Sequence, residues 1–394
     1  MKFTVIECFL IVVAFLAIGE FVSTKTKAYI PSVFVAALCF LIGFWTFAPK
    51  DLVTQASFGP SFVSISMSLL LVHLGTLMSL KKLIEQWKAV VIAVVGICGT
   101  VLVTMTIGRA LFDYHVVVAV TPPLTGGIVA ALLMSQALTA KGLPALAVLP
   151  VAMFVMHSFV GYPITSWCLK REGSRLISDY RSKGPDENVI KESLILNADR
   201  KKLIPRTPET YLSPYFILAK VMIVGILASW LSGLTKGAVN QYVVCLVLGV
   251  IFCEIGFLDE SSLVKAGVMN WLMAGLLAYV FSTLNTVTPA ILGNIIVPII
   301  VLIILGILGM FITSSIIGKF LGYSKEMGFA CALTALFGFP ADYILTHEVC
   351  KSLSTNEDEQ NYLVDILLPR MLVGGFATVS IASVVIATVF INLL

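Results

Sequence analysis

Charge is the scarcest property of this 394-residue chain. Only 12% of its residues are Asp, Glu, Lys or Arg, whereas a soluble domain has about 25%. Hydrophobic residues make up 58%. This composition excludes a soluble globular protein and predicts an all-α protein that crosses a lipid bilayer many times. The apolar runs are long and continuous instead of short and alternating, which excludes an outer-membrane β-barrel.

Motifs of several function classes are also missing. The chain has no GxxxxGK[ST], which argues against a self-contained ATP-driven pump. It has no zinc-finger or RNP pattern, and its net charge of +4 is too small to predict a nucleic-acid partner. His347 and Glu348 lack the second histidine of HExxH, and Asp342 lacks the second membrane aspartate of an intramembrane protease. We therefore expect neither enzyme activity nor a cofactor.

Apolar runs of roughly 20 residues are long enough to span a bilayer, and here they fall into two halves with the same order. Each half has four runs, a broken segment and a fifth run. The runs are 3–22, 31–48, 58–80, 89–112 and 143–169, then 215–235, 240–257, 263–286, 290–320 and 367–394. We predict a first repeat over 1–169 with a hairpin at 115–140, a polar linker over 170–213, and a second repeat over 214–394 with a hairpin at 326–350.

The positions of the basic residues indicate whether a broken segment crosses the bilayer or enters and leaves on the same side. If 115–140 is re-entrant, so that it enters and leaves on one side, then Lys25, Lys81 and the whole basic linker fall together on the other side. The positive-inside rule makes that crowded side cytoplasmic. Each half then has an odd number of crossings, so the second repeat is inverted relative to the first. We predict a multi-pass protein of the plasma or inner membrane, with both termini outside and the linker in the cytoplasm.

The first broken segment contains TPPLTGG, residues 121–127. Irregular backbone at membrane depth survives only where protein or a water-filled cavity satisfies it, and in inverted-repeat transporters such breaks come in pairs at the substrate site. Glycine allows a ligand to approach closely, and the arm that follows directs a positive dipole end at the break. We therefore assign substrate binding to Thr121, Pro122, Thr125, Gly126 and Gly127. The alternative is an ordinary interhelical loop near the surface.

The second broken segment contains FGFPAD, residues 337–342. Gly338 and Phe339 are assigned to the substrate, and Pro340 fits the first position of a helical arm. Asp342 then falls in the first turn of that arm. An ionisable residue at membrane depth suggests a cation or proton site. The alternative is a helix-start carboxylate that accepts from local N–H groups.

Four further polar residues are candidates. His73, an intramembrane histidine, and Arg370, at the start of the last span, are assigned to the substrate. A packing histidine and an interfacial arginine are the alternatives. Asn285 and Thr334 are assigned to the ion together with Asp342, although Asn285 could merely join helices. His157, in MHSFVGYP, is expected to face protein.

TGG at 125–127, FGFP at 337–340 and VHLGTLMSLKKL at 72–83 carry a family resemblance. In plan the chain resembles the glutamate:sodium symporters and the related 2-hydroxycarboxylate transporters. The resemblance implies two inverted repeats of five transmembrane helices, each with a re-entrant hairpin. It also implies a homodimer that works by an elevator motion. The implied activity is Na⁺-coupled symport of a small organic anion or amino acid.

Two other functions stay open. One is a cation/proton antiporter that uses Asp342 as its titrating group. The other is a membrane receptor or assembly protein without flux, for which two paired breaks would have no purpose.

Overall fold

The computed structural model describes residues 3–77, 86–143, 146–183, 203–205, 208, 211–234, 241–286 and 288–394. Most of the predicted linker 170–213 and the end of the 72–83 motif lie outside these ranges. Every secondary-structure element within them is a helix. Six helices are long and apolar enough to cross a membrane: Val5–Lys25, Trp87–Leu111, Leu149–Ser182, Pro214–Leu234, Ile295–Phe320 and Glu357–Val379. The all-helical fold is the one predicted, and it suits a multi-pass membrane protein.

The chain forms two compact units, which we describe separately. The smaller unit contains residues 1–9, 53–85 and 176–280, and the larger contains 10–52, 86–175 and 281–394. The main helices of the smaller unit are α4 (Pro60–Gly75), α11 (Pro214–Leu234), α12 (Gln241–Glu254), α13 (Ser262–Lys265) and α14 (Met269–Ser282).

Glycine lets α4 and α12 touch backbone to backbone. A Cβ on Gly75 would lie 2.4 Å from the carbonyl oxygen of Leu246, and a Cβ on Gly249 would lie 2.2 Å from that of Val72. Such a close crossing is typical of membrane helices, which associate through van der Waals packing of small residues. Within the same unit, Lys220 Nζ lies 3.0 Å from Asp259 Oδ2.

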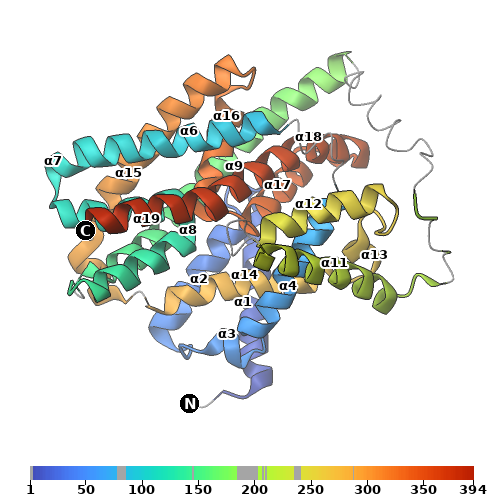
Figure 1. Ribbon diagram of the computed structural model, residues 1–394, viewed down its shortest axis with the longest axis horizontal. Helices are drawn as coiled ribbons and strands as arrows, with labels where there is room; N and C mark the ends of the chain where they lie inside the picture. Colours follow the sequence, from blue (N-terminus) through green and yellow to red (C-terminus); the bar gives the residue numbers. More distant parts are fainter. Residues whose placement is uncertain are drawn as a thin grey trace. The chain divides into compact units, whose positions relative to one another are not determined.

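The larger unit contains the remaining helices, except for the start of α1 and the end of α9, which belong to the smaller unit. Figure 1 labels most of these helices. They are α1 (Val5–Lys25), α2 (Ser32–Thr46), α6 (Trp87–Val103), η1 (Thr104–Gly108), α7 (Arg109–Leu111), α8 (Tyr114–Ala140), α9 (Leu149–Lys183), η4 (Thr283–Thr286), α15 (Pro289–Phe320), α16 (Lys325–Phe337), α17 (Ala341–Leu353), α18 (Glu357–Phe376), η5 (Ala377–Ala382) and α19 (Ser383–Leu393). The short α3 (Leu52–Gln55) lies where the two units join along the sequence.

α6 and α15 of the larger unit cross at close range. A Cβ on Gly99 would lie 2.5 Å from the carbonyl oxygen of Gly309, and a Cβ on Gly309 would lie 2.4 Å from that of Gly99. Thr100 Oγ1 also donates to the Gly306 carbonyl at 3.0 Å. The two backbones are therefore in direct contact, and any larger residue at either glycine would separate them.

Two helices extend further than their apolar runs predict. The fifth run was expected to end at 169, but α9 continues to Lys183, inside the predicted linker. The last run was expected to begin at 367, but α18 begins at Glu357, after Asn356 accepts from the Asp358 N–H. Acidic residues in the first turn favour a helix start through the helix dipole. Hydropathy marks only the apolar part of such a helix, so both boundaries were misplaced.

Candidate functional site: two broken helices

α8 is broken at Gly127, where φ is 64° and ψ is −149°. Its first residue, Tyr114, donates from its hydroxyl to the Leu393 carbonyl at 3.3 Å. Lys141, just after its last residue, donates to the Ile391 carbonyl at 2.6 Å. A straight helix of 27 residues would separate these ends by about 40 Å. Because both ends reach the same end of α19, α8 consists of two arms that fold back on each other.

A second break separates α16 from α17. Gly338 there has φ 62° and ψ −161°, nearly the conformation of Gly127. Before α16, Ser324 Oγ donates to Glu172 Oε2 at 2.7 Å. At the end of α17, Leu353 Cδ1 lies 2.5 Å from the position of a Cβ on Gly173. Both ends of this segment therefore contact neighbouring residues of α9, so it also folds back.

The first break is narrower than the TPPLTGG pattern predicts. Residues 121–126 are helical, and only Gly127 leaves the helical region. Thr121 Oγ1 donates to the Val117 carbonyl at 2.8 Å and to Thr104 Oγ1 at 3.1 Å, and Thr125 Oγ1 donates to the Pro122 carbonyl at 2.9 Å. These hydroxyls bond carbonyls of the preceding turn, and the backbone stays helical through Pro122 and Pro123. The predicted residues are buried in the helical arm.

The two breaks meet at one side chain, Val379 of η5. The position of a Cβ on Gly127 lies 3.6 Å from Val379 Cγ1 and 4.0 Å from the Leu336 carbonyl oxygen. The position of a Cβ on Gly338 lies 2.9 Å from Val379 Cγ2. Ser383, one turn later, lies against Gly126. The structure therefore brings the two segments singled out in the sequence into one place.

Asp342 is a fully buried carboxylate in the first turn of α17. Neither of its oxygens has a hydrogen-bond partner among the described residues. Its Oδ2 lies 2.2 Å from the position of a Cβ on Gly375 in α18, and Thr334 lies 3.5 Å from the same position. Burying an unpaired carboxylate costs roughly several kcal/mol of folding free energy. A bound proton or cation would offset this cost.

His157 of α9 lies between the breaks, and the sequence did not assign it to the substrate. Its Nε2 is hydrogen-bonded to the Leu336 carbonyl, and its buried Nδ1 has no partner among the described residues. Phe154, one turn earlier, packs edge-on against His157 and lies 4.0 Å from the position of a Cβ on Gly127. Tyr162, also in α9, has its ring centroid 5.0 Å from that of Phe337. The only sequence signal for the position of His157 beside the breaks was that a histidine occurs in an apolar run.

Three predicted residues make other contacts. Asn285 Nδ2 donates to the Lys50 carbonyl at 2.6 Å, which is a link between helix ends. His73 lies in the smaller unit, where its Nδ1 accepts from the Leu263 N–H at 3.2 Å. The Arg370 guanidinium lies 4.8 Å from the centre of the Tyr323 ring. Burial raises the pKa of Tyr323 to about 12, although Arg370 opposes the shift, so this contact is a cation–π interaction with a neutral phenol. Thr334, in contrast, does lie beside Asp342.

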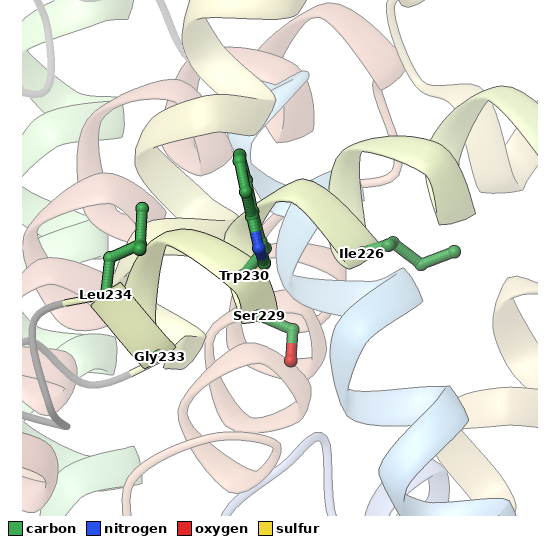
Figure 2. A pocket seen from close by; sticks show the side chains of 5 residues that line it. All are labelled: Ile226, Ser229, Trp230, Gly233 and Leu234. Atoms are coloured by element: carbon green, nitrogen blue, oxygen red, sulfur yellow. The ribbon is translucent and has the colours of Figure 1, made fainter.

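A surface hollow lies elsewhere, on α11 of the smaller unit. Figure 2 shows that all its lining residues come from that one helix: Ile226, Ser229, Trp230, Gly233 and Leu234. The side chain of Trp230 is 66% exposed. The hollow is therefore the outer face of a membrane helix and holds no cluster of polar groups. Among the residues that the structure describes, no group of three or more His, Cys, Asp or Glu could hold a metal ion.

No protein-family model matches this chain, and no curated protein matches its sequence. Its function is therefore argued from the geometry of the broken helices.

Proposed function

We propose that this protein is a secondary active transporter that carries a small organic anion or amino acid together with Na⁺. The observation that carries the proposal is the pair of broken helices: Gly127 and Gly338 have nearly the same unusual conformation and both lie against one valine. Asp342, whose carboxylate has no hydrogen-bond partner among the described residues, donates its backbone N–H to the Gly338 carbonyl at 3.1 Å. Paired breaks near the middle of the bilayer are where inverted-repeat transporters bind substrate and ions.

The arrangement of α6 and α15 supports an inverted repeat. Gly99 of α6 and Gly309 of α15 contact each other at the crossing. One turn earlier, Gly96 packs against Ala332 in the second broken segment, while Gly306 packs against Leu124 in the first. The interval from Gly99 to Gly127 nearly equals the interval from Gly309 to Gly338. Reciprocal contacts at matched positions are expected when two copies of one fold are related by a twofold axis in the membrane plane.

The ion would bind at Asp342. Thr334 offers a hydroxyl oxygen beside the carboxylate, because its proton is donated to the Cys331 carbonyl at 2.6 Å. Oxygen ligands suit a hard cation such as Na⁺. A bound cation would also neutralise the buried charge, so that a carboxylate substrate and the ion enter the protein at lower cost together than separately.

The substrate carboxylate would bind at the breaks. The second arm of α8 begins directly after Gly127, and α17 begins at Ala341. Each arm therefore directs its N-terminal N–H groups and the positive end of its dipole toward a break. Gly127 and Gly338 leave the backbone open to close approach. The elevator motion, the homodimer, the external termini and the cytoplasmic linker belong to the same proposal.

Uptake by purified protein in proteoliposomes tests the function. Labelled L-glutamate, L-aspartate, succinate and citrate are supplied with an inward Na⁺ gradient, with K⁺ in place of Na⁺, and with the gradient collapsed. We expect uptake of at least one compound above its external concentration only when the Na⁺ gradient is present. Absence of Na⁺-dependent uptake for all such acids would overturn symport.

A cation/proton antiporter is the second candidate, because the Asp342 carboxylate has no donor partner among the described residues and is a group that can bind a proton. Its signature is Na⁺ exchange that depends on the pH gradient and needs no organic compound. A receptor or assembly protein would show neither Na⁺-dependent uptake of an organic acid nor Na⁺ exchange.

A further inference from the structure

Val379 separates the two breaks of the larger unit. One of its methyl groups faces Gly127 and the other faces Gly338, at 3.6 Å and 2.9 Å from the respective Cβ positions. The three heavy atoms nearest to the Cβ position of Gly338, apart from those of its chain neighbours, all belong to the side chain of Val379. A substrate held between the breaks would therefore lie against Val379.

The helix that carries Val379 is irregular at this point. Residues 377–382 form the π-helical turn η5, which joins α18 to α19. Figure 1 shows α19 running beside α8, and the contact of Ser383 with Gly126 belongs to the same interface. A π-turn inserts one residue into a helix and is frequent at functional sites. Here it places a β-branched side chain, which has few rotamers, at the point where the breaks meet.

We propose that Val379 sets the length of substrate that fits between the two breaks, an inference that rests on the proposed transport function. The polar ends of a substrate would be held by the helix N-termini and by the cation at Asp342. An apolar valine would then contact the hydrocarbon part. Its size would decide how many methylene groups fit, since one methylene in an apolar pocket changes discrimination by about 10- to 200-fold.

Substitutions that change the volume of residue 379 test this directly. Val379→Ala removes two methyl groups, and Val379→Ile adds one. The probes are two homologous series in proteoliposomes: succinate, glutarate and adipate, and L-aspartate, L-glutamate and L-2-aminoadipate. For the series that the wild type transports, we expect Val379→Ala to raise the uptake of the next longer member relative to the best one at least tenfold. Val379→Ile should shift preference to the shorter member.

Two controls separate size from other effects. Val379→Thr keeps the shape of the side chain and should keep the wild-type order of substrates, although its hydroxyl lowers the overall rate. Val385→Ala, on the same helix at a position that is 57% exposed, should change nothing. If Val379→Ala fails to fold, Val379→Ile and Val379→Thr still give different expectations, because only Val379→Ile should shift preference to the shorter member.

The outcomes distinguish this inference from the proposed function. If the wild type transports a member of either series and the variants keep its order of preference, Val379 does not select the substrate and the inference is wrong. Equal loss of all substrates in Val379→Ala and Val379→Ile would also overturn it, because the residue would then only hold the breaks together. If the wild type transports no compound, the proposed function itself fails.

Discussion

Asp342 and Gly375 form a pair in which each residue depends on the other. The carboxylate reaches so close to α18 that a Cβ at position 375 would overlap with it. The sequence indicated both Asp342 and Thr334. Asp342 was found because an acidic residue directly after the Gly-Phe-Pro break is a local pattern. The pattern could not reveal Gly375 or Val379, because both act through contacts with residues that are distant along the chain.

Asp342→Asn tests the ion site. We expect the variant to lose the rise in unfolding temperature that Na⁺ gives the wild type, with apparent Na⁺ affinity lowered at least tenfold. Without Na⁺ the variant should be as stable as the wild type or more stable, because a buried unpaired charge has been removed. Thermal unfolding of purified protein over a NaCl series, with KCl at matched ionic strength, measures both effects. Asp365→Asn, at an exposed position of α18, is the matched control, and an unchanged Na⁺ response in Asp342→Asn would remove Asp342 from the site.

Gly375→Ala tests the contact between Asp342 and α18. The added methyl group would meet Oδ2 at 2.2 Å, so we expect a loss of about 1–3 kcal/mol in unfolding free energy. In the double variant Gly375→Ala/Asp342→Ala the clash is gone, and the two effects should be clearly non-additive. Gly233→Ala in α11, where a Cβ meets nothing within 4 Å, should be neutral or stabilising. Additive behaviour of the pair in denaturation curves would contradict the geometry.

At the scale of the elements, the two hairpins follow from short sequence signals. Both breaks were located because glycine and proline interrupt an apolar run. The sequence did not show that the first helix continues through Pro122 and Pro123, because prolines and glycines in an apolar run indicate a break without fixing the residue at which it falls. Nor did it show that α9 supports the second hairpin at both ends, through Glu172 and Gly173.

Alanine at the two break glycines should have unequal effects. Both positions have φ and ψ values that are essentially confined to glycine, so each substitution costs about 1–3 kcal/mol in backbone strain. At Gly338 the new methyl group would also lie 2.9 Å from Val379, whereas at Gly127 its nearest neighbour is 3.6 Å away. We therefore expect Gly338→Ala to lower the unfolding temperature more than Gly127→Ala. Gly142→Ala, at φ 78° with nothing within 4 Å, serves as a control; an order with Gly127→Ala as the most damaging variant would contradict the packing.

Glu172 should stabilise the start of the second hairpin. Its side chain is 2% exposed, bonds Arg175 at 2.6 Å, and accepts from Ser324, the N-cap of α16. In Glu172→Gln we expect faster amide hydrogen exchange in α16, because the cap residue loses a charge-assisted partner. The first arm of α8, which Asp113 caps, provides an internal reference. Unchanged exchange in α16, or equal acceleration in both arms, would show that Glu172 does not hold this hairpin.

At the scale of the whole molecule, composition was sufficient to predict an all-helical membrane protein. The sequence did not predict which helices pack together in each unit. The sequence predicted two repeats, 1–169 and 214–394, with the same order of elements. In the structure α11 and α12 belong to the smaller unit, whereas α2 and most of α1 belong to the larger one with both hairpins. Hydropathy gives the number and order of spans, while their partners are decided by small-residue contacts such as Gly75 with Gly249 and Gly99 with Gly309.

The topology of the larger unit can be argued from contacts between chain segments at the same depth. Ser166 Oγ donates to the Ala28 carbonyl at 2.5 Å, and Lys170 Nζ lies 3.5 Å from the centre of the Tyr29 ring. The end of the fifth span therefore lies beside the first loop. A re-entrant 115–140 segment requires this arrangement, whereas a full crossing would put residues 28 and 170 on opposite sides of the bilayer. The bonds of Tyr114 and Lys141 to the last turn of α19 likewise place both ends of α8 beside the C-terminus.

Reporter fusions in a bacterial inner membrane test this topology. Green fluorescent protein inserted in the linker near residue 190 should fluoresce, because that segment is expected in the cytoplasm, where positive charge is retained. Alkaline phosphatase fused after Leu394 should be active and green fluorescent protein there dark, since the C-terminus is expected outside. An insertion at residue 142 should behave like the C-terminal fusion. A fluorescent fusion at 142 combined with an external C-terminus would mean that 115–140 crosses the bilayer completely, and the inverted repeat would then be wrong.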